Sequence, residues 1–285
     1  MKIDGRLIAD KILQNLKFEI EQIPPIQPKP KLVIILVGDN PASLSFIRQK
    51  TQIGQKLGVA VVLKKYPSLV NVRKLTAELT ILANDPLNHG IIIQRPLPLQ
   101  FDVQKLNSLI PPVKDVDGFL ENSAHLSPVG LAVLEILKTV YSKLKKRNKF
   151  ITWAKQQKIV LLGFGQTAGK PINKTLTVYG ITPEIITSQT PHRAQILKSA
   201  EIVISVVGKP YILKANEIKP GIMVLGVGLS YVNGKAVGDY DAEQIDRVAK
   251  FYTPTPGGVG PVNVACLFRN LISAYKQLNI PEVST

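Results

Sequence analysis

The sequence predicts an α/β protein made of two lobes, each built on a parallel β-sheet. Short runs rich in β-branched residues alternate with helical patterns in both halves of the chain. These runs are almost continuously apolar, which is typical of parallel strands covered by helices on both faces. The length of 285 residues, 45% of them hydrophobic, is sufficient for two domains with cores of their own.

The first lobe is expected to span residues 1–122. Its predicted strands are Leu32–Val37, Val59–Leu63 and Gly90–Gln94, each bounded by Gly, Pro or polar residues. The last apolar-periodic segment of the chain, Val264–Leu278, is predicted to be a helix. This C-terminal helix, within residues 264–285, is expected to pack back on the first lobe.

The second lobe is expected to span residues 123–263. It opens with a predicted helix, because Ser127 is typical of an N-cap, Pro128 of the first helical position, and apolar residues then recur at helical spacing. Its predicted strands are Ile159–Leu162, Glu184–Thr187, Glu201–Val207 and Ile222–Gly228, with Phe251–Tyr252 as a candidate last strand.

The chain is strongly basic, with 36 Lys and Arg against 20 Asp and Glu and a net charge of +16. About half of this excess lies between residues 138 and 158, a stretch without a single acidic residue. Its basic residues are Lys138, Lys143, Lys145, Lys146, Arg147, Lys149, Lys155 and Lys158. Cations favour the C-terminal end of a helix, so a solvated helix end is the favoured interpretation. Nucleic-acid binding is disfavoured, because few aromatic residues are interleaved with the charges.

The N-terminal segment and the cysteine content favour a cytoplasmic protein. Charged residues interrupt the first sixteen positions, and the longest aliphatic run, Leu32–Val37, is far shorter than a membrane span. The single cysteine, Cys266, excludes an internal disulfide. No membrane partner and no metal are expected.

A glycine-rich turn in the second lobe is typical of a site for a dinucleotide. Gly163, Gly165 and Gly169 follow a predicted strand and precede a helix, where backbone amides can face a pyrophosphate, although purely structural turns also use glycine. About 20 residues further on, no carboxylate is present to bind the ribose of NAD. The hydroxyls and the cation of residues 187–193 favour NADP instead, and NAD remains an alternative.

Four motifs carry the most specific signal. Three lie in the first lobe: Gly38–Lys50, Gly90–Pro98 with the sequence QRPLP at its end, and Ile110–Phe119 with the sequence KDVDGF. The fourth, Thr253–Pro261, is a Pro- and Gly-rich loop that would let a flat ligand approach the backbone.

In this order, with the glycine-rich turn between the third and fourth, the motifs resemble the bifunctional methylenetetrahydrofolate dehydrogenase/cyclohydrolase (FolD) family. The resemblance covers essentially the whole chain. It implies a catalytic first domain, a Rossmann-like nucleotide-binding second domain and a homodimer. It also implies oxidation of 5,10-methylenetetrahydrofolate with NADP, followed by hydrolysis of the methenyl product to 10-formyltetrahydrofolate.

The resemblance also assigns roles to residues of this chain. Lys50 matches the family's catalytic lysine, Gln94 its partner and Asp117 the aspartate that holds the pterin. A lysine can exchange protons near neutral pH if desolvation lowers its pKa, and a glutamine can orient it without keeping it protonated. The implied substrate-binding residues are Phe46, Pro256, Gly257 and Gly258. The implied cofactor-binding residues are Gly163, Phe164, Gly165, Gly169, Ser188, Thr190, Arg193 and Leu229.

The chain departs from the family pattern at several positions. Phe46 stands where Tyr is common, which keeps the ring and loses a hydroxyl from the lysine's network, so weaker cyclohydrolase activity is expected. Phe164 and Gly165 replace a polar pair, often Arg-Ser, which lowers the expected preference for NADP. Two alternatives therefore stay open. One is a dehydrogenase with little or no cyclohydrolase activity, and the other is a non-catalytic relative that binds a ligand or nucleic acid.

Overall fold

The computed structural model describes residues 1–144 and 146–279, so Lys145 of the basic stretch and the end of the predicted 264–285 segment lie outside it. The chain forms two compact units. The five-stranded unit comprises Met1–Asp10 and Val129–Asn263, and the three-stranded unit comprises Lys11–Pro128 and Val264–Thr285. The first ten residues belong with the five-stranded unit because Ile3 and Gly5 donate backbone hydrogen bonds to the carbonyls of Tyr252 and Gly257.

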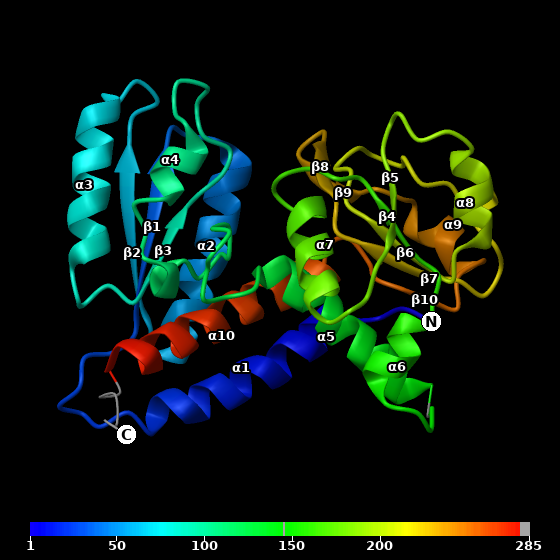
Figure 1. Cartoon of the computed structure of the whole chain (residues 1–285), viewed down its shortest axis with the longest axis horizontal. Coiled ribbons are helices and arrows are strands. Elements are labelled where there is room, and N and C mark those ends of the chain that lie inside the picture. The colour runs from blue at the N-terminus through cyan, green and yellow to red at the C-terminus, as the bar shows by residue number, and fades with distance from the viewer. Residues whose placement is uncertain (145, 280–285) are drawn as a thin grey trace. The chain divides into compact units, whose positions relative to one another are not determined.

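The three-stranded unit contains a parallel sheet in the order β2-β1-β3. The strands are β1 (Lys31–Val37), β2 (Ala60–Tyr66) and β3 (Gly90–Ile93). Helix α2 (Pro41–Leu57) connects β1 to β2, and α3 (Val72–Asn84) connects β2 to β3 on the other face of the sheet (Figure 1). The predicted parallel sheet is confirmed, with strand ends shifted by one to three residues.

Alternate residues of β1 face two different cores. Leu32, Ile34 and Leu36 pack in one core cluster with Ile47 of α2 and Phe268 of α10 (Val259–Asn279). Val33, Ile35 and Val37 of β1 pack in a second cluster with α3 and the short α4 (Val103–Asn107). Both faces of β1 are therefore buried, and the C-terminal helix packs on the first lobe as the sequence predicts.

The five-stranded unit contains a parallel sheet in the order β10-β7-β6-β4-β5. Its strands are β4 (Ile159–Leu162), β5 (Glu184–Ile186), β6 (Ile202–Ser205), β7 (Met223–Gly226) and β10 (Phe251–Tyr252). The chain runs from β4 out to the edge strand β5 and then returns to β6 on the other side of β4. This reversal creates a switch point between β4 and β6, where open α/β sheets bind their ligands.

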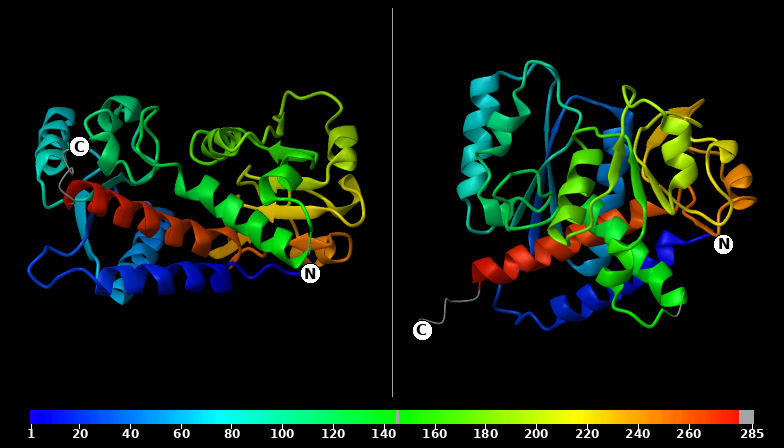
Figure 2. Two further views of the ribbon diagram at one scale, coloured as in Figure 1. Left: turned by 60° about the horizontal axis from the view of Figure 1, so that its bottom comes forward. Right: turned by 45° about the vertical axis from the view of Figure 1, so that its right-hand side comes forward.

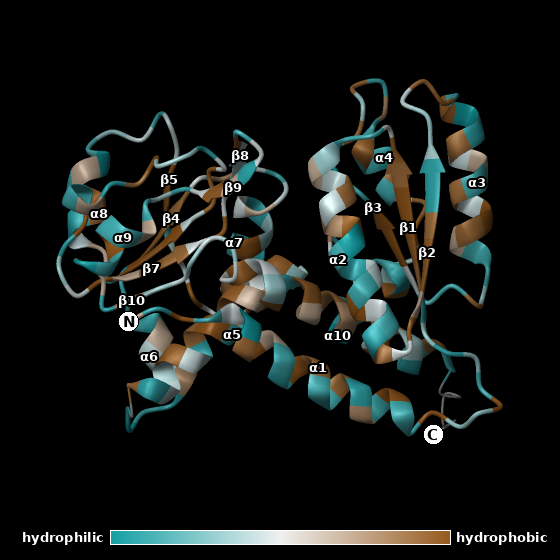
Figure 3. Ribbon diagram, turned by 180° about the vertical axis from the view of Figure 1, so that it is seen from behind, coloured by the Kyte–Doolittle hydropathy of each residue, from teal (hydrophilic) through white to brown (hydrophobic). Residues whose placement is uncertain are grey.

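Helices cover both faces of this sheet (Figure 2). On one face, α8 (Arg193–Ser199) and α9 (Ala242–Asp246) bury Leu197 and Ile245 against strand residues. On the other lie α7 (Gly169–Val178) and α5 (Pro128–Lys143), which approach closely because Gly130 of α5 faces Thr175 of α7. Most strands of the two sheets are coloured as hydrophobic in Figure 3, whereas the end of β2 is coloured as hydrophilic.

The remaining described helices are α1 (Gly5–Glu21), α6 (Phe150–Lys155) and the 3₁₀ turns η1 (Pro112–Lys114) and η2 (Ala215–Glu217). Two strands were not predicted from the sequence, β8 (Leu229–Val232) and β9 (Lys235–Gly238), which form an antiparallel hairpin. The sequence does contain a feature that predicts this hairpin, because Asn-Gly at positions 233 and 234 is a typical two-residue hairpin turn. Both residues have positive φ in the structure. Among residues 1–144 and 146–279, no helix combines the length and apolarity that crossing a membrane requires.

Candidate active site

Helix α2 positions Lys50 in the three-stranded unit. The helix begins with Pro41, and the side chain of Asn40 caps it by accepting a hydrogen bond from the backbone N–H of Ser43 at 3.0 Å. Phe46 and Lys50 lie one turn apart, and the Lys50 side chain is buried. The capped helix thus fixes an amine in the interior.

Lys50 and Gln94 form the expected pair. The Lys50 Nζ donates a hydrogen bond to Gln94 Oε1 at 3.0 Å, and Gln94 follows directly after β3. The amide of Gln94 is held at its other end, because Nε2 donates to the carbonyl of Arg95 at 3.0 Å. Ser43 Oγ donates to the same carbonyl at 3.0 Å, which joins the start of α2 to the loop after β3.

The electrostatics of the cluster depend on two groups of opposite charge, the buried Lys50 and the half-buried Asp117. Burial lowers the pKa of Lys50, and the nearby charge of Asp117 acts in the opposite direction. Burial raises the pKa of Asp117, with Lys50 and Arg95 opposing that shift and Asp115 adding to it. Lys50 therefore releases a proton more readily than a lysine in water, which is the property that acid–base chemistry near neutral pH requires.

In the KDVDGF loop, two charged residues make hydrogen bonds that stabilise the loop, and the third does not. Lys114 Nζ donates to the carbonyls of Ala83 and Asp85 at 2.8 and 2.7 Å, and Asp115 Oδ2 accepts from Leu120 N at 2.8 Å. Asp117 alone among the loop's charged residues has no hydrogen-bond partner in the described parts of the chain. It is therefore the carboxylate left for a ligand.

Two further contacts fix the backbone of the same loop. Asn270 Nδ2 of α10 donates to the carbonyls of Val116 and Leu126 at 2.9 and 2.8 Å. Gly118 adopts a φ of +67°, and a Cβ there would lie 2.7 Å from Ser127 N, so only glycine fits. The loop that carries Asp117 is consequently rigid on both sides of the aspartate.

Arg95 is a site residue that the sequence reasoning missed. Its guanidinium carbon lies 3.6 Å from the centroid of the Phe119 ring, and its Nε is buried without a partner. Burial lowers the pKa of Arg95, against the attraction of Asp117 and Asp115. The sequence feature that could have identified Arg95 is its position directly after Gln94, inside the QRPLP motif.

The glycine-rich turn after β4 has the geometry of a phosphate-binding turn. Gly163 has a φ of +102°, and a Cβ on it would lie 3.2 Å from the backbone of Val206, at the end of β6. A Cβ on Gly169 would lie 2.6 Å from the Gly163 carbonyl. The N-cap residue of α7 is Ala168, whose side chain has no polar atom to cap the helix, and a helix N-terminus is a favourable position for an anion. Phe164 and Gly165 lie within the turn.

The loop after β5 contains the remaining cofactor candidates. Thr190 Oγ1 accepts a hydrogen bond from Thr187 N at 2.9 Å, while Ser188 is exposed. The Arg193 guanidinium is engaged within the unit, where Nη2 donates to the Ile212 carbonyl at 2.7 Å and lies 3.3 Å from Glu217 Oε2.

Asp239 organises the loop after β6 and was assigned no role from the sequence. Its buried carboxylate accepts four hydrogen bonds, from Ser205 Oγ and from the backbone N–H groups of Val207, Gly208 and Lys209, at 2.7 to 3.2 Å. This loop and the glycine-rich turn meet at the switch point, where Gly163 contacts Val206.

The substrate candidates Pro256, Gly257 and Gly258 belong to the five-stranded unit, in the loop between β10 and α10, and Leu229 begins β8 in the same unit. Gly258 is closely surrounded, because a Cβ on it would lie 2.4 Å from the Pro254 carbonyl. Phe46, Lys50, Gln94 and Asp117 all belong to the three-stranded unit.

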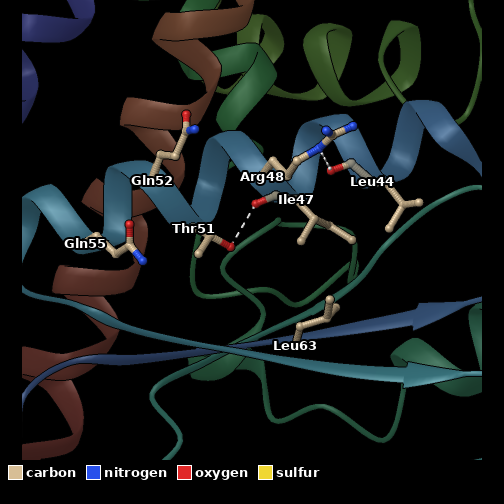
Figure 4. Close-up of a pocket in the computed structure, with 7 residues that line it drawn as sticks. All are labelled: Leu44, Ile47, Arg48, Thr51, Gln52, Gln55 and Leu63. Carbon is tan, nitrogen blue, oxygen red and sulfur yellow. Dashed lines mark hydrogen bonds between the residues drawn. The ribbon is translucent and has the colours of Figure 1, made fainter.

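A second face of α2 lines a groove of about 540 Å³ together with β2 (Figure 4). Leu44, Ile47 and Leu63 make much of its wall, and Arg48 is the only charged residue among those that line it. Arg48 Nε donates to the carbonyl of Leu44 in its own helix. The groove lacks Lys50, Gln94 and Asp117, so it is not part of the proton-exchanging cluster.

A Rossmann-type sheet with a glycine-rich turn, joined in one chain to a second α/β unit with a buried lysine cluster, defines the class of two-domain α/β dehydrogenases. Family models agree with this class. Residues 3–117 match the catalytic domain of tetrahydrofolate dehydrogenase/cyclohydrolase, and residues 138–279 match its NAD(P)-binding domain. The chain belongs to the tetrahydrofolate dehydrogenase/cyclohydrolase family.

Individual relatives match over nearly their whole length. Bifunctional protein FolD of a Hydrogenobaculum species is 36% identical, with 96% of this chain and 98% of that protein covered. The crystal structure of the bifunctional enzyme FolD from Campylobacter jejuni superposes with a TM-score of 0.88 at 28% identity, covering 97% and 99% of the two chains. The Trypanosoma brucei enzyme, solved with NADP cofactor and an inhibitor, has the same TM-score and identity, with 97% of each chain covered.

Proposed function

We propose that this protein oxidises 5,10-methylenetetrahydrofolate to the methenyl form with NADP and hydrolyses the product to 10-formyltetrahydrofolate. The single observation that carries the proposal is the cluster in the three-stranded unit. It combines a buried lysine of lowered pKa, hydrogen-bonded to Gln94, with the Asp117 carboxylate that has no donor within the described residues.

Lys50 is the proton-exchanging group of the hydrolysis. Water adds to the methenyl carbon, and a proton must leave that water and reach the nitrogen that departs as the five-membered ring opens. A desolvated amine serves both steps, because its neutral form accepts the proton and its ammonium form returns it. The hydrogen bond to Gln94 orients Nζ without stabilising the charged form as strongly as a carboxylate would.

Asp117 is the anchor for the pterin ring. A carboxylate can accept two parallel hydrogen bonds from the amino group and the ring N–H of the pterin. The hydrogen-bonded loop fixes the position of Asp117, and no donor among the described residues occupies its two oxygens. The ring of Phe46, one turn before Lys50, supplies a flat apolar surface for stacking.

The five-stranded unit contains the residues that would hold the nicotinamide cofactor. Gly163, Gly165 and Gly169 and the uncapped start of α7 suit the pyrophosphate, with Phe164 in the turn and Ser188, Thr190 and Leu229 as further contacts. A bound dinucleotide would supply the hydride acceptor for the oxidation. The contribution of the protein to that step is positioning, since hydride transfer needs little acid–base assistance.

The finer assignments are part of the same proposal. Residues 1–122 with the C-terminal helix would form the folate-binding catalytic domain, and residues 123–263 the NAD(P)-binding domain. Pro256, Gly257 and Gly258 would contact substrate. A homodimer and a cytoplasmic location are expected from the resemblance and the composition, and size-exclusion chromatography with light scattering tests the first of them.

The test separates the two activities. Methylenetetrahydrofolate is supplied with NADP or NAD while formation of the methenyl product and reduction of the dinucleotide are followed by absorbance. Reduction of neither dinucleotide would contradict the dehydrogenase assignment. Methenyltetrahydrofolate is then supplied alone, and its decay is compared with the uncatalysed rate. Decay at the uncatalysed rate would leave a dehydrogenase without cyclohydrolase activity.

A further inference from the structure

Arg193 is the only lysine or arginine in the loop between β5 and α8, residues 187–192, and the first turn of α8. In Rossmann-type sheets this region meets the ribose of the adenosine half. A carboxylate there selects the 2′-hydroxyl of NAD, and an arginine accommodates the 2′-phosphate of NADP. Whether the Arg193 guanidinium is free to bind a phosphate therefore affects the choice between NADP and NAD. This inference rests on the proposed function.

The guanidinium of Arg193 already has partners inside the five-stranded unit. Nη2 donates to the carbonyl of Ile212 at 2.7 Å and forms an ion pair with Glu217 Oε2 at 3.3 Å. The Arg193 side chain is 30% exposed and that of Glu217 25%. Nε is buried without a partner, so the base of the guanidinium does not face solvent.

Glu217 is itself fixed where it meets Arg193. It ends η2, and its Oε2 also accepts a hydrogen bond from the backbone N–H of Lys214 at 2.8 Å. A carboxylate with a backbone donor is held in one orientation, unlike an exposed glutamate that can swing away. Any phosphate that approached Arg193 would meet this fixed negative charge.

The rest of the loop has neither a carboxylate that would select NAD nor a Lys or Arg that would pair with the 2′-phosphate of NADP. Its hydroxyls are neutral donors, and Thr190 Oγ1 also accepts a hydrogen bond from Thr187 N. Lys170 lies at the start of α7, 5.9 Å above the ring of Phe164 in the glycine-rich turn. That position suits the pyrophosphate, which NAD and NADP share.

We propose that Glu217 determines cofactor preference by holding Arg193 in an internal ion pair, so that Arg193 does not bind the 2′-phosphate and NADP and NAD bind with similar affinity. Glu217 acts through Arg193 and is a specificity-determining residue rather than a catalytic one. Removing its charge frees the guanidinium for the 2′-phosphate.

Dissociation constants for NADP and NAD, measured by isothermal titration calorimetry on the full chain without folate, test the proposal. The unaltered protein is expected to show values within about 10-fold of each other. Glu217→Gln should tighten NADP at least 5-fold and leave NAD unchanged. Arg193→Gln should change both affinities by less than 2-fold, and the double variant should behave like Arg193→Gln.

A matched control removes one negative charge elsewhere in the same unit. Glu184→Gln, at the exposed start of β5, should leave the NADP to NAD ratio unchanged. Circular dichroism and the melting temperature establish that each variant is folded. If Glu217→Gln does not fold, the effect of Arg193→Gln on the affinities for NADP and NAD decides whether the proposal holds.

The outcomes separate cleanly. A loss of NADP affinity of 10-fold or more in Arg193→Gln, with NAD unchanged, would make Arg193 the 2′-phosphate contact and overturn the inference. An unchanged ratio in folded Glu217→Gln would also overturn it. Failure of the unaltered chain to bind either dinucleotide would contradict the proposed function itself, and with it this inference.

Discussion

Two aspartates, one in each unit, differ in how the protein treats their charge. Asp239 of the five-stranded unit is fully buried and accepts four hydrogen bonds from its own unit. Asp117 of the three-stranded unit accepts none within the described residues, and burial raises its pKa. The first carboxylate stabilises a loop, while the second is kept desolvated at a cost to folding stability.

The same contrast appears between two lysines of the three-stranded unit. Lys114 and Lys50 are both buried, and burial lowers the pKa of each. Lys114 donates to two backbone carbonyls, whereas Lys50 donates to the side-chain amide of Gln94. Two backbone carbonyls hold the charge of Lys114 in place, whereas Lys50 has a single side-chain partner within the described residues and keeps donors for a ligand.

The largest expected effect follows from removing the amine of Lys50. Lys50→Met should lower the rate of methenyltetrahydrofolate hydrolysis roughly 100-fold or more, because general acid–base catalysis contributes about that factor. The hydrolysis assay measures it, and Lys56→Met, at an exposed position of the same helix, is the control. Hydrolysis at the unaltered rate in Lys50→Met would remove Lys50 from its role.

The two aspartates should respond in opposite ways to the same substitution. Asp239→Asn should lower the free energy of unfolding by about 2–4 kcal/mol, because an amide cannot accept from all four donors. Asp117→Asn should leave the free energy of unfolding unchanged or raise it, since it removes a desolvated charge, while folate binding falls sharply. Urea titrations measure the free energy of unfolding of each variant, and a folate-binding assay measures the loss of binding. Equal destabilisation by the two variants would contradict the different roles assigned to Asp239 and Asp117.

A third buried group predicts the response of the three-stranded unit to acid. His89 accepts a hydrogen bond from Lys31 N and packs against the Tyr275 ring, and burial, together with Lys114 and Lys31, lowers its pKa to about 4. As the pH falls, His89 is therefore protonated in the unfolded chain before it is protonated in the folded protein. The stability from neutral His89 is complete above about pH 6.5 and falls by roughly 3 kcal/mol as the pH approaches 4.

Replacing His89 should flatten that dependence. Asparagine retains an acceptor for Lys31 N but does not titrate, so urea midpoints of His89→Asn should change less between pH 7.5 and 4.5 than those of the unaltered protein. His192→Asn, at an exposed position with positive φ, is the control and should keep the full slope. An identical slope in His89→Asn would exclude His89 as the cause.

The smallest expected effect concerns the hydroxyl absent at Phe46. Phe46→Tyr should raise the rate of hydrolysis several-fold, because one hydrogen bond contributes roughly 1 kcal/mol to the network of Lys50. Hydride transfer should change less, since it depends on ring positioning. Comparison of the two rates in one preparation measures the difference, and equal changes would count against the assignment.

Much of the fold could be predicted from the sequence, because buried parallel strands leave continuous apolar runs. The sheets, α5 and the C-terminal helix follow from those runs and from helical periodicity. The β8–β9 hairpin was missed because its exposed strands carry no such run, although Asn233-Gly234 marks its turn.

The site was predictable only in part. The resemblance of the motifs to a known family identifies Lys50, Gln94 and Asp117 as candidates, and the structure contains the Lys50–Gln94 hydrogen bond. Spacing does not show that Glu217, 24 residues after Arg193, engages its guanidinium. It also does not show that Asp239 fixes a loop more than 30 residues before it, because such pairings depend on tertiary contacts.

The hydrogen bonds from Asn270 to the carbonyls of Val116 and Leu126 affect the order in which the protein can mature during synthesis. The loop bearing Asp117 emerges from the ribosome about 150 residues before the amide that fixes it. The whole five-stranded sheet is translated in the interval. A nascent chain arrested before residue 264 would therefore carry every residue of the lysine cluster and still lack the side chain that fixes its aspartate loop.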